Sequence, residues 1–178
     1  MAKALTGTFT ITSRLSTATA GYDTVTIPIG SLIDVGDAQA LEIESVDYIY
    51  QSYSTTGDVY EVIHPGAPYG ADASFGAQLM DRNAQTFLPA SDNNLISSSA
   101  VQFDYANITS HASEFFPDDF QKTNGRFVVN DEVYLTSFNS AATAANTELS
   151  VTVRIRAKVV KLSTRDWMAI SLETVQNE

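Results

Sequence analysis

The sequence predicts an all-β protein: an antiparallel β-sandwich, in its simplest form a single jelly roll of eight strands. Apolar and polar residues alternate with a period of two along much of the chain, which is the pattern of strands that bury one face. No helical segments of about 10–15 residues alternate with these strands, which excludes a parallel α/β sheet. Uneven and partly long connections fit a jelly roll. An immunoglobulin-like sandwich is the alternative, without its usual Cys…Trp…Cys core, because the chain has no cysteine.

The first half of the chain predicts strands at 6–13, 23–29 and 40–53. The first two alternate threonine with large apolar residues. Pro28 has no N–H for a ladder hydrogen bond, so the second strand lies at an edge or ends there. In the third strand the apolar residues change parity halfway along. A bulge near Ser45 would keep them all on the inner side.

A turn follows the long strand, and 58–63 is predicted to return beside it as a hairpin. A helical turn or two is predicted within 110–124, and Ser163 is predicted to cap a short helix in the tail. The whole chain, 1–178, is expected to form one domain, with its sandwich over about 5–162 and a tail at 163–178. The remaining predicted strands are 76–80, 99–106, 126–138 with a break at Asn130–Asp131, and 148–162.

The net charge of −11 comes from 21 acidic and 10 basic residues and argues against binding of a specific nucleic acid. Half of the basic residues fall within 12 positions near the end of the chain. This cluster is predicted to contact an acidic neighbour, an anionic lipid surface or packaged nucleic acid. Pairing across strands with Glu42, Glu44 or Asp47 is the alternative. The cluster consists of Arg154, Arg156, Lys158, Lys161 and Arg165.

Tyrosines concentrate around the predicted hairpin and the loop after it. A tyrosine offers a large contact area and a hydrogen-bonding tip, so such a group suits a protein interface or a sugar platform. The same residues also suit an ordinary sandwich core. Tyr48, Tyr50 and Tyr69 join the basic cluster as candidate assembly contacts, with Tyr53 and Tyr60 beside them.

No catalytic, cofactor or metal site is predicted. The two histidines, His64 and His111, lie in predicted loops, and the chain has no Gly-x-Ser-x-Gly or nucleotide-binding glycine motif. The acidic segment from His111 to Asp119 includes Glu114 and Asp118, but it lacks the spacing of a calcium loop. No apolar run reaches the about 18–20 residues of a membrane span, and no secretory signal peptide is recognised at the start.

Three segments resemble a known family of viral shell proteins: TVTIPIGSLIDV (24–35), QALEIESVDYIY (39–50) and ELSVTVRIRAKVVKL (148–162). They look like the vertical single jelly-roll capsid proteins of membrane-containing icosahedral viruses that infect halophilic archaea. The resemblance covers about the first 63 residues and the last 30. It lies in the general pattern of residues along these segments rather than in a diagnostic motif. Small, acidic, cysteine-free subunits are common to both. No catalytic or binding residue is carried over.

The resemblance implies a major capsid subunit that is made in the host cytoplasm and assembles into the virion. It implies a homo-oligomer, a second capsid protein and contact with a viral membrane beneath the shell. The alternative function is a non-catalytic binding module, either a carbohydrate-binding or a virion spike sandwich. Such a module would use the tyrosine-rich hairpin and the 64–77 loop.

Overall fold

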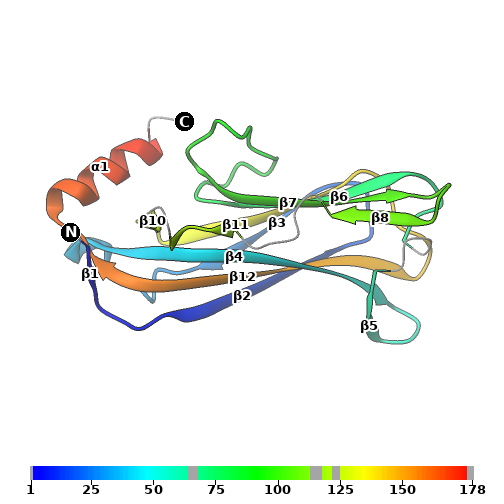
Figure 1. The fold of residues 1–178 in the computed structure, drawn as a ribbon, viewed down its shortest axis with the longest axis horizontal. Helices are drawn as coiled ribbons and strands as arrows, with labels where there is room; N and C mark the ends of the chain where they lie inside the picture. The colour runs from blue at the N-terminus through cyan, green and yellow to red at the C-terminus, as the bar shows by residue number, and fades with distance from the viewer. Residues whose placement is uncertain (1, 64–67, 113–117, 122–124, 176–178) are drawn as a thin grey trace.

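Two antiparallel sheets lie face to face in the computed structural model, which describes residues 2–63, 68–112, 118–121 and 125–175 (Figure 1). A 3₁₀ turn, η1 (Val35–Asp37), precedes the longest strand, and a helix, α1 (Thr164–Val175), follows the last one. Sheet A comprises β1 (Lys3–Ala4), β2 (Phe9–Thr17), β4 (Gln39–Ser54), β5 (Val59–Val62), β9 (Asp118–Asp119), β10 (Arg126–Val128) and β12 (Thr147–Lys161). Sheet B comprises β3 (Gly21–Pro28), β6 (Ala73–Met80), β7 (Leu95–Asp104), β8 (Thr109–Ala112) and β11 (Glu132–Asn139).

The strand order is that of a jelly roll. In sheet A, β12 lies between β2 and β4, and the free side of β4 takes β10, β9 and β5 in succession. In sheet B the order is β3-β11-β6-β7-β8. The early strands pair with the late ones, because β2 pairs with β12 in sheet A and β3 pairs with β11 in sheet B, as in a jelly roll. The predicted jelly-roll sandwich is therefore confirmed.

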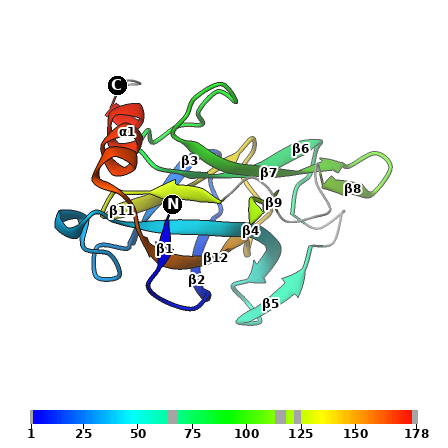
Figure 2. The same ribbon diagram turned by 60° about the vertical axis from the view of Figure 1, so that its left-hand side comes forward.

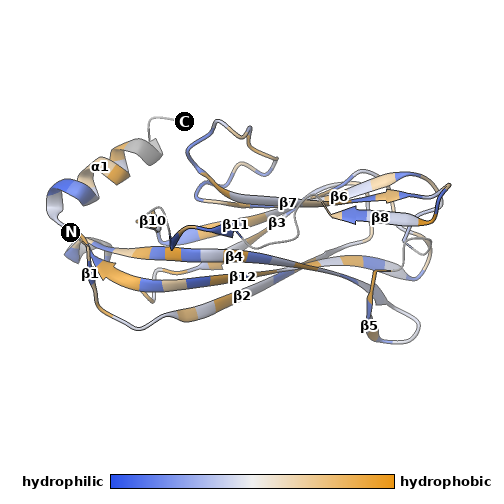
Figure 3. Ribbon diagram, in the orientation of Figure 1, coloured by the Kyte–Doolittle hydropathy of each residue, from blue (hydrophilic) through white to orange (hydrophobic). Residues whose placement is uncertain are grey.

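The core lies between the sheets and is built by alternate residues of each strand. In β12, Val153, Ile155 and Ala157 are fully buried, whereas Arg154 and Arg156 between them are exposed. Figure 3 shows the corresponding blue and orange bands along this strand. The inner face of sheet B contributes fully buried residues of the same kind. They include Phe75, Leu79, Val133 and Leu135.

A bulge in β4 confirms the predicted change of phase. Arg156 pairs with Ser45, but the next residue of β12, Ala157, pairs with Ile43, so Glu44 has no partner of its own in the ladder. The extra residue allows Ile43 and Val46 to be buried on the same side of the sheet.

Several strand bounds differ from the prediction. β2 begins three positions late, at Phe9, because the backbone N–H groups of Leu5 and Thr6 donate to Val159 instead of forming a regular ladder. β7 begins early, at Leu95, where small serines conceal the apolar alternation. β3 lies at the edge of sheet B and ends at Pro28, as predicted.

The region predicted as 126–138 is divided between the sheets at Asn130–Asp131, with β10 in sheet A and β11 in sheet B. Within 110–124, the described residues include β8 and β9, whereas 113–117 and 122–124 lie outside the described residues. The predicted helical turn therefore remains untested there.

The C-terminal helix packs on a small second core at one end of the sandwich (Figure 2). Its cap is the predicted one, because the backbone N–H of Asp166 donates to Ser163 Oγ at 3.2 Å. Trp167 and Ile170 pack against Val160 and Leu162 at the end of β12. None of the helices formed by the described residues is long and apolar enough to cross a membrane.

A buried carboxylate ties the end of β6 to the turn between β10 and β11. Asp81 is 3% exposed, and Asn130 Nδ2 donates to its Oδ1 at 2.6 Å and to its backbone oxygen at 2.9 Å. The Asp81 N–H donates to Asn94 O at 2.9 Å. Burial raises the pKa of Asp81 to about 6, although the bond from Asn130 and the charge of Arg126 act in the opposite direction.

Because the folded-state pKa of Asp81 lies above its ordinary value of 3.8, the native protein keeps a proton that the unfolded chain has lost. This group therefore reduces stability as the pH rises from about 4 to above 6. We expect Asp81→Asn, which cannot ionise, to gain up to about 2 kcal/mol relative to wild type between pH 4 and pH 8. Urea unfolding at each pH measures this difference, with Asp131→Asn, an exposed carboxylate in the β10–β11 turn, as the control. Parallel wild-type and Asp81→Asn profiles would contradict the prediction.

Candidate assembly surface

The outer face of sheet A presents the basic residues of β12. Arg154, Arg156 and Lys158 point outward together because the residues between them face the core. The register places Arg154 between Thr12 of β2 and Asp47 of β4. The predicted cluster thus begins as a row along one strand.

Lys158 follows the alternative interpretation, pairing across strands. Its Nζ lies 3.0 Å from Glu42 Oε1 and 3.2 Å from Glu44 Oε1, and the three side chains are only 26%, 13% and 11% exposed. Thr8 Oγ1 donates to the other oxygen of Glu44 at 3.1 Å. Desolvation raises the pKa of Glu44, but the bonds from Lys158 and Thr8 outweigh it and leave that pKa lowered. The bond to Glu42 raises the pKa of Lys158.

The last two basic residues of the cluster are separated from this row. Lys161 Nζ forms an exposed ion pair with Asp37 Oδ1 at 2.6 Å, and this contact lowers the pKa of Asp37. Arg165 is exposed on the first turn of α1. The sequence cluster is therefore a row of three residues on the sheet with two residues at its end.

The tyrosines divide between the core and the surface. Tyr48 donates to Ser97 O at 3.1 Å and accepts from the N–H of Leu79 at 3.1 Å, and burial raises its pKa. Tyr69 is 3% exposed and its hydroxyl donates to Asn139. Burial also raises the pKa of Tyr69.

Tyr50 packs edge-on against Phe75 in the core, with ring centroids 5.8 Å apart. The three tyrosines singled out from the sequence, Tyr48, Tyr50 and Tyr69, thus pack within the subunit, and their role in assembly stays a prediction. The surface pair is Tyr53 and Tyr60, with ring centroids 4.8 Å apart on the β4–β5 hairpin.

Arg14 is the functional candidate that sequence reasoning missed. It is exposed on β2, and its guanidinium carbon lies 4.8 Å from the centroid of Tyr60. Arg14 is far from the basic cluster in sequence, but the pairing of β2 with β12 places it opposite Thr152, next to Arg154. The outward parity of Arg14 was visible in the strand pattern. The pairing partner of that strand was not.

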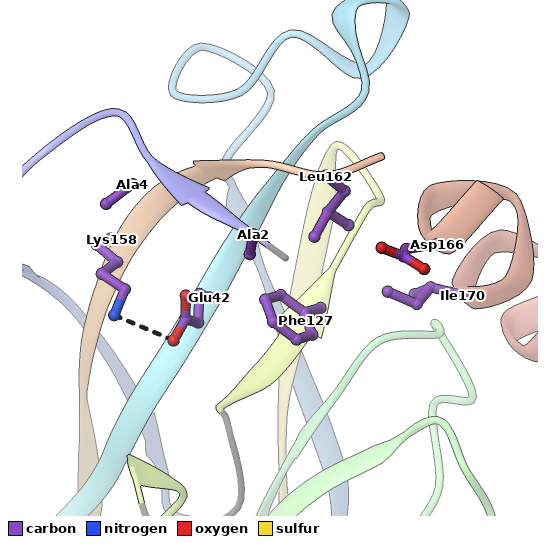
Figure 4. A pocket seen from close by; sticks show the side chains of 8 residues that line it. All are labelled: Ala2, Ala4, Glu42, Phe127, Lys158, Leu162, Asp166 and Ile170. Atoms are coloured by element: carbon purple, nitrogen blue, oxygen red, sulfur yellow. Dashed lines mark ion pairs between the residues drawn. The ribbon is translucent and has the colours of Figure 1, made fainter. Parts of the chain in front are cut away.

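A hollow of about 480 Å³ separates α1 from the sandwich (Figure 4). Phe127, Leu162 and Ile170 form its apolar side, and the Lys158–Glu42 ion pair forms the other. The Lys158 ammonium and the Glu42 carboxylate already pair with each other there. The hollow lies where the helix meets the sheet, and it offers few polar side chains that could bind a polar ligand.

A second, more open depression of about 530 Å³ lies over β7 and β8 of sheet B. Asp72 Oδ1 accepts from the N–H of Tyr105 at 2.8 Å, and bonds from Asn107 lower the pKa of Asp104. The other polar residues of the depression are Ser74, Gln102, His111 and Ser140.

The acidic segment near His111 is not gathered around one point. His111 lies on β8 of sheet B, whereas Asp118 and Asp119 form β9 of sheet A. Glu114 and His64 lie outside the described residues. Among the residues that the structure describes, no three His, Asp or Glu side chains are placed to hold a metal ion.

Comparison with known proteins finds no matching family model and no matching curated protein. Solved structures of polyomavirus VP1 do match. VP1 of Trichodysplasia spinulosa-associated polyomavirus, in complex with 3'-sialyllactose, has 8% identity and a TM-score of 0.51, over 91% of this chain and 97% of that chain. An unassembled pentamer of Merkel cell polyomavirus VP1 has 6% identity and a TM-score of 0.47 over 90% and 98%. Chimpanzee polyomavirus VP1 has 7% identity and a TM-score of 0.44 over 90% and 99%.

The likeness to the first of these proteins shows a common fold. It extends over nearly the full length of both chains, so the shared unit is the sandwich as a whole. At 8% identity it leaves the function to be argued separately.

The Lys158 network gives a prediction for stability. Lys158→Met keeps the packing of the stem but leaves Glu42 and Glu44 side by side without their cation. We expect a loss of about 1–2 kcal/mol at pH 7, less than for a fully buried pair because water reaches the site. Lys161→Met, at the exposed pair, should leave the melting temperature unchanged within error.

The pH dependence of that loss follows from the lowered pKa of Glu44. A carboxyl with a lowered folded-state pKa contributes stability above its ordinary value of 4.5 and loses it as the pH falls through the folded value. Wild type and Lys158→Met should therefore converge in urea unfolding once the pH has fallen below the lowered folded-state pKa of Glu44. A difference that persists there, or no difference at pH 7, would count against the ion-pair interpretation.

Proposed function

We propose that this protein is a viral capsid subunit. The observation that carries the proposal is its jelly-roll topology, shared over 91% of this chain with a polyomavirus VP1. The shared fold extends this role to the chain by analogy. The three segments that resemble single jelly-roll capsid proteins support it independently, because that resemblance lies in the amino-acid sequence and not in the fold.

The finer details rest on that sequence resemblance. We propose a major capsid protein of the vertical single jelly-roll type, in an icosahedral virion of a halophilic archaeal virus, with a membrane beneath the shell. A second capsid protein would complete the shell. The role is structural, with no catalysis, and the negative charge of −11 supports contacts with protein rather than recognition of a nucleic acid.

The proposal predicts self-assembly. Purified protein should form oligomers or closed particles that grow with protein concentration, visible by light scattering, analytical ultracentrifugation and negative-stain electron microscopy. The salt concentration should be varied, because repulsion between subunits of charge −11 is screened by salt. A protein that stays monomeric under every condition, and is absent from particles of its source, would refute the proposal.

A glycan-binding module is the second candidate, favoured by the depression over β7 and β8. The matching VP1 was solved with 3'-sialyllactose, which makes a sugar a reasonable ligand to test. Carboxylates, amides and hydroxyls that converge on a shallow surface can bind sugar hydroxyls. Asp72 and Asp104 would, however, repel an anionic sugar, so we propose a neutral glycan for this chain.

A glycan array tests this candidate. Binding of neutral glycans should be lost in Gln102→Ala, in the depression, and kept in Gln51→Ala on sheet A. Sialylated glycans should bind less well than their neutral counterparts. Absence of binding, or binding that Gln102→Ala does not change, would exclude the depression as a sugar site.

A further inference from the structure

The middle of the outer face of sheet A, from Lys158 to Thr152 along β12, is divided into a basic half and an acidic half. Its bases lie on β2 and β12, and its acids lie on β4 and β9, whereas Glu148 lies beyond this part, at the start of β12. The bases are Arg14, Arg154, Arg156 and Lys158. The acids are Glu42, Glu44, Asp47 and Asp119.

The division follows from strand register and runs across the sheet. One row across the four strands is Thr10, Arg156, Ser45 and Asp119. The next row is Thr12, Arg154 and Asp47. Because neighbouring strands are about 4.8 Å apart, Arg156 and Asp119 are about 10 Å apart at the backbone. The polarity therefore extends over the width of the sheet.

Much of this charge is available to a partner. Arg14, Arg154, Arg156 and Asp119 are exposed, and Asp47 is half-buried. Within the part of the chain that the structure describes, neither Arg154 nor Arg156 forms an ion pair. Lys158 differs, since Glu42 and Glu44 already hold it.

We infer that this face binds the same face of a second copy of the chain, with the basic half of each copy over the acidic half of the other. The inference rests on the proposed capsid function and names a contact for it. A two-fold axis parallel to the strands, between β12 and β4, sets Arg154 over the partner subunit's Asp47, and the reverse contact forms at the same time. A two-fold axis perpendicular to the strands would instead place the basic residues of β12 over those of the second copy.

The size of the face is sufficient. The 15 residues of β12 make it about 50 Å long, and the spacing of four strands makes it about 15 Å wide. The product is close to the about 800 Å² that each partner buries in a standard interface. Two copies that each carry a net charge of −11 repel each other overall. The contact between the basic half of one copy and the acidic half of the other adds a local attraction.

Charge reversal with complementation tests the inference. Arg154→Glu with Arg156→Glu should weaken self-association at least about tenfold in analytical ultracentrifugation, and so should Asp47→Arg with Asp119→Arg. An equimolar mixture of the two variants should restore association, because one face is then largely acidic and the other largely basic. Circular dichroism and thermal melting verify that each variant is folded.

Lys3→Glu with Thr109→Glu and Ser110→Glu is the matched control. The reversal of Lys3 changes the charge by −2 and each new glutamate changes it by −1, so the control and the Arg154/Arg156 variant both change from −11 to −15. The control residues are exposed and lie on β1 and on β8 of sheet B, off the central rows. The control should associate nearly as wild type does.

The outcomes separate the inference from the proposed function. If wild type assembles and both reversed variants assemble equally well, or their mixture restores nothing, the inference is wrong and the capsid proposal stands. If Arg154→Glu with Arg156→Glu instead abolishes binding to anionic lipid vesicles or to DNA and leaves self-association intact, a phosphate-bearing partner replaces the second copy. Wild type that never self-associates contradicts the capsid proposal itself.

Discussion

The pairing of β4 with β12 is the constraint on which the rest of the molecule depends. These two long strands form a ladder from Thr147 opposite Ser54 to Lys161 opposite Gln39, interrupted once by the bulge at Glu44. The ladder fixes which residues of sheet A face the core. It therefore fixes which charges reach the outer face and in what order. The remaining strands of sheet A, including β2, β5, β9 and β10, all attach to one side of this pair or the other.

Local pattern was sufficient to predict the main strands and the bulge, since alternation of apolar residues is a property of each segment by itself. It was insufficient where polar residues are buried. Ser97 in β7 is 4% exposed, and Asn94 just before that strand is fully buried. The short strands β1, β8 and β9 have too few residues to show a period. β1 and β9 pair with strands that are distant in the sequence, and β8 forms a hairpin with β7. Predicting the place of Arg14 beside the β12 row required the order of the strands, which no single segment contains.

The same distinction, between the local pattern of one segment and the order of the strands, explains which residues form the candidate surface. Proximity in sequence grouped five bases near the end of the chain, but the fold pairs Lys158 with carboxylates and places Arg165 on the helix. It leaves Arg154 and Arg156 exposed and adds Arg14 from a strand far away in the sequence. The tyrosine group divided in a similar way, because alternate residues of one strand face opposite sides of a sheet. In both cases the residues lie close together in the sequence. Whether each side chain faces the core or the solvent decides whether it is available to a partner.

The position of β12 near the end of the chain also limits when the subunit can fold. Both β2 and β4 need β12 as a neighbour, and residues 147–161 follow more than a hundred residues after β2 has been synthesised. Pairing at such separation is slow, and open strand edges invite wrong partners in the meantime. The charged outer face arises only when β12 takes its place between the other two strands. An incomplete chain therefore lacks that surface, so under the proposed capsid function the fold itself would exclude unfinished subunits from a growing shell.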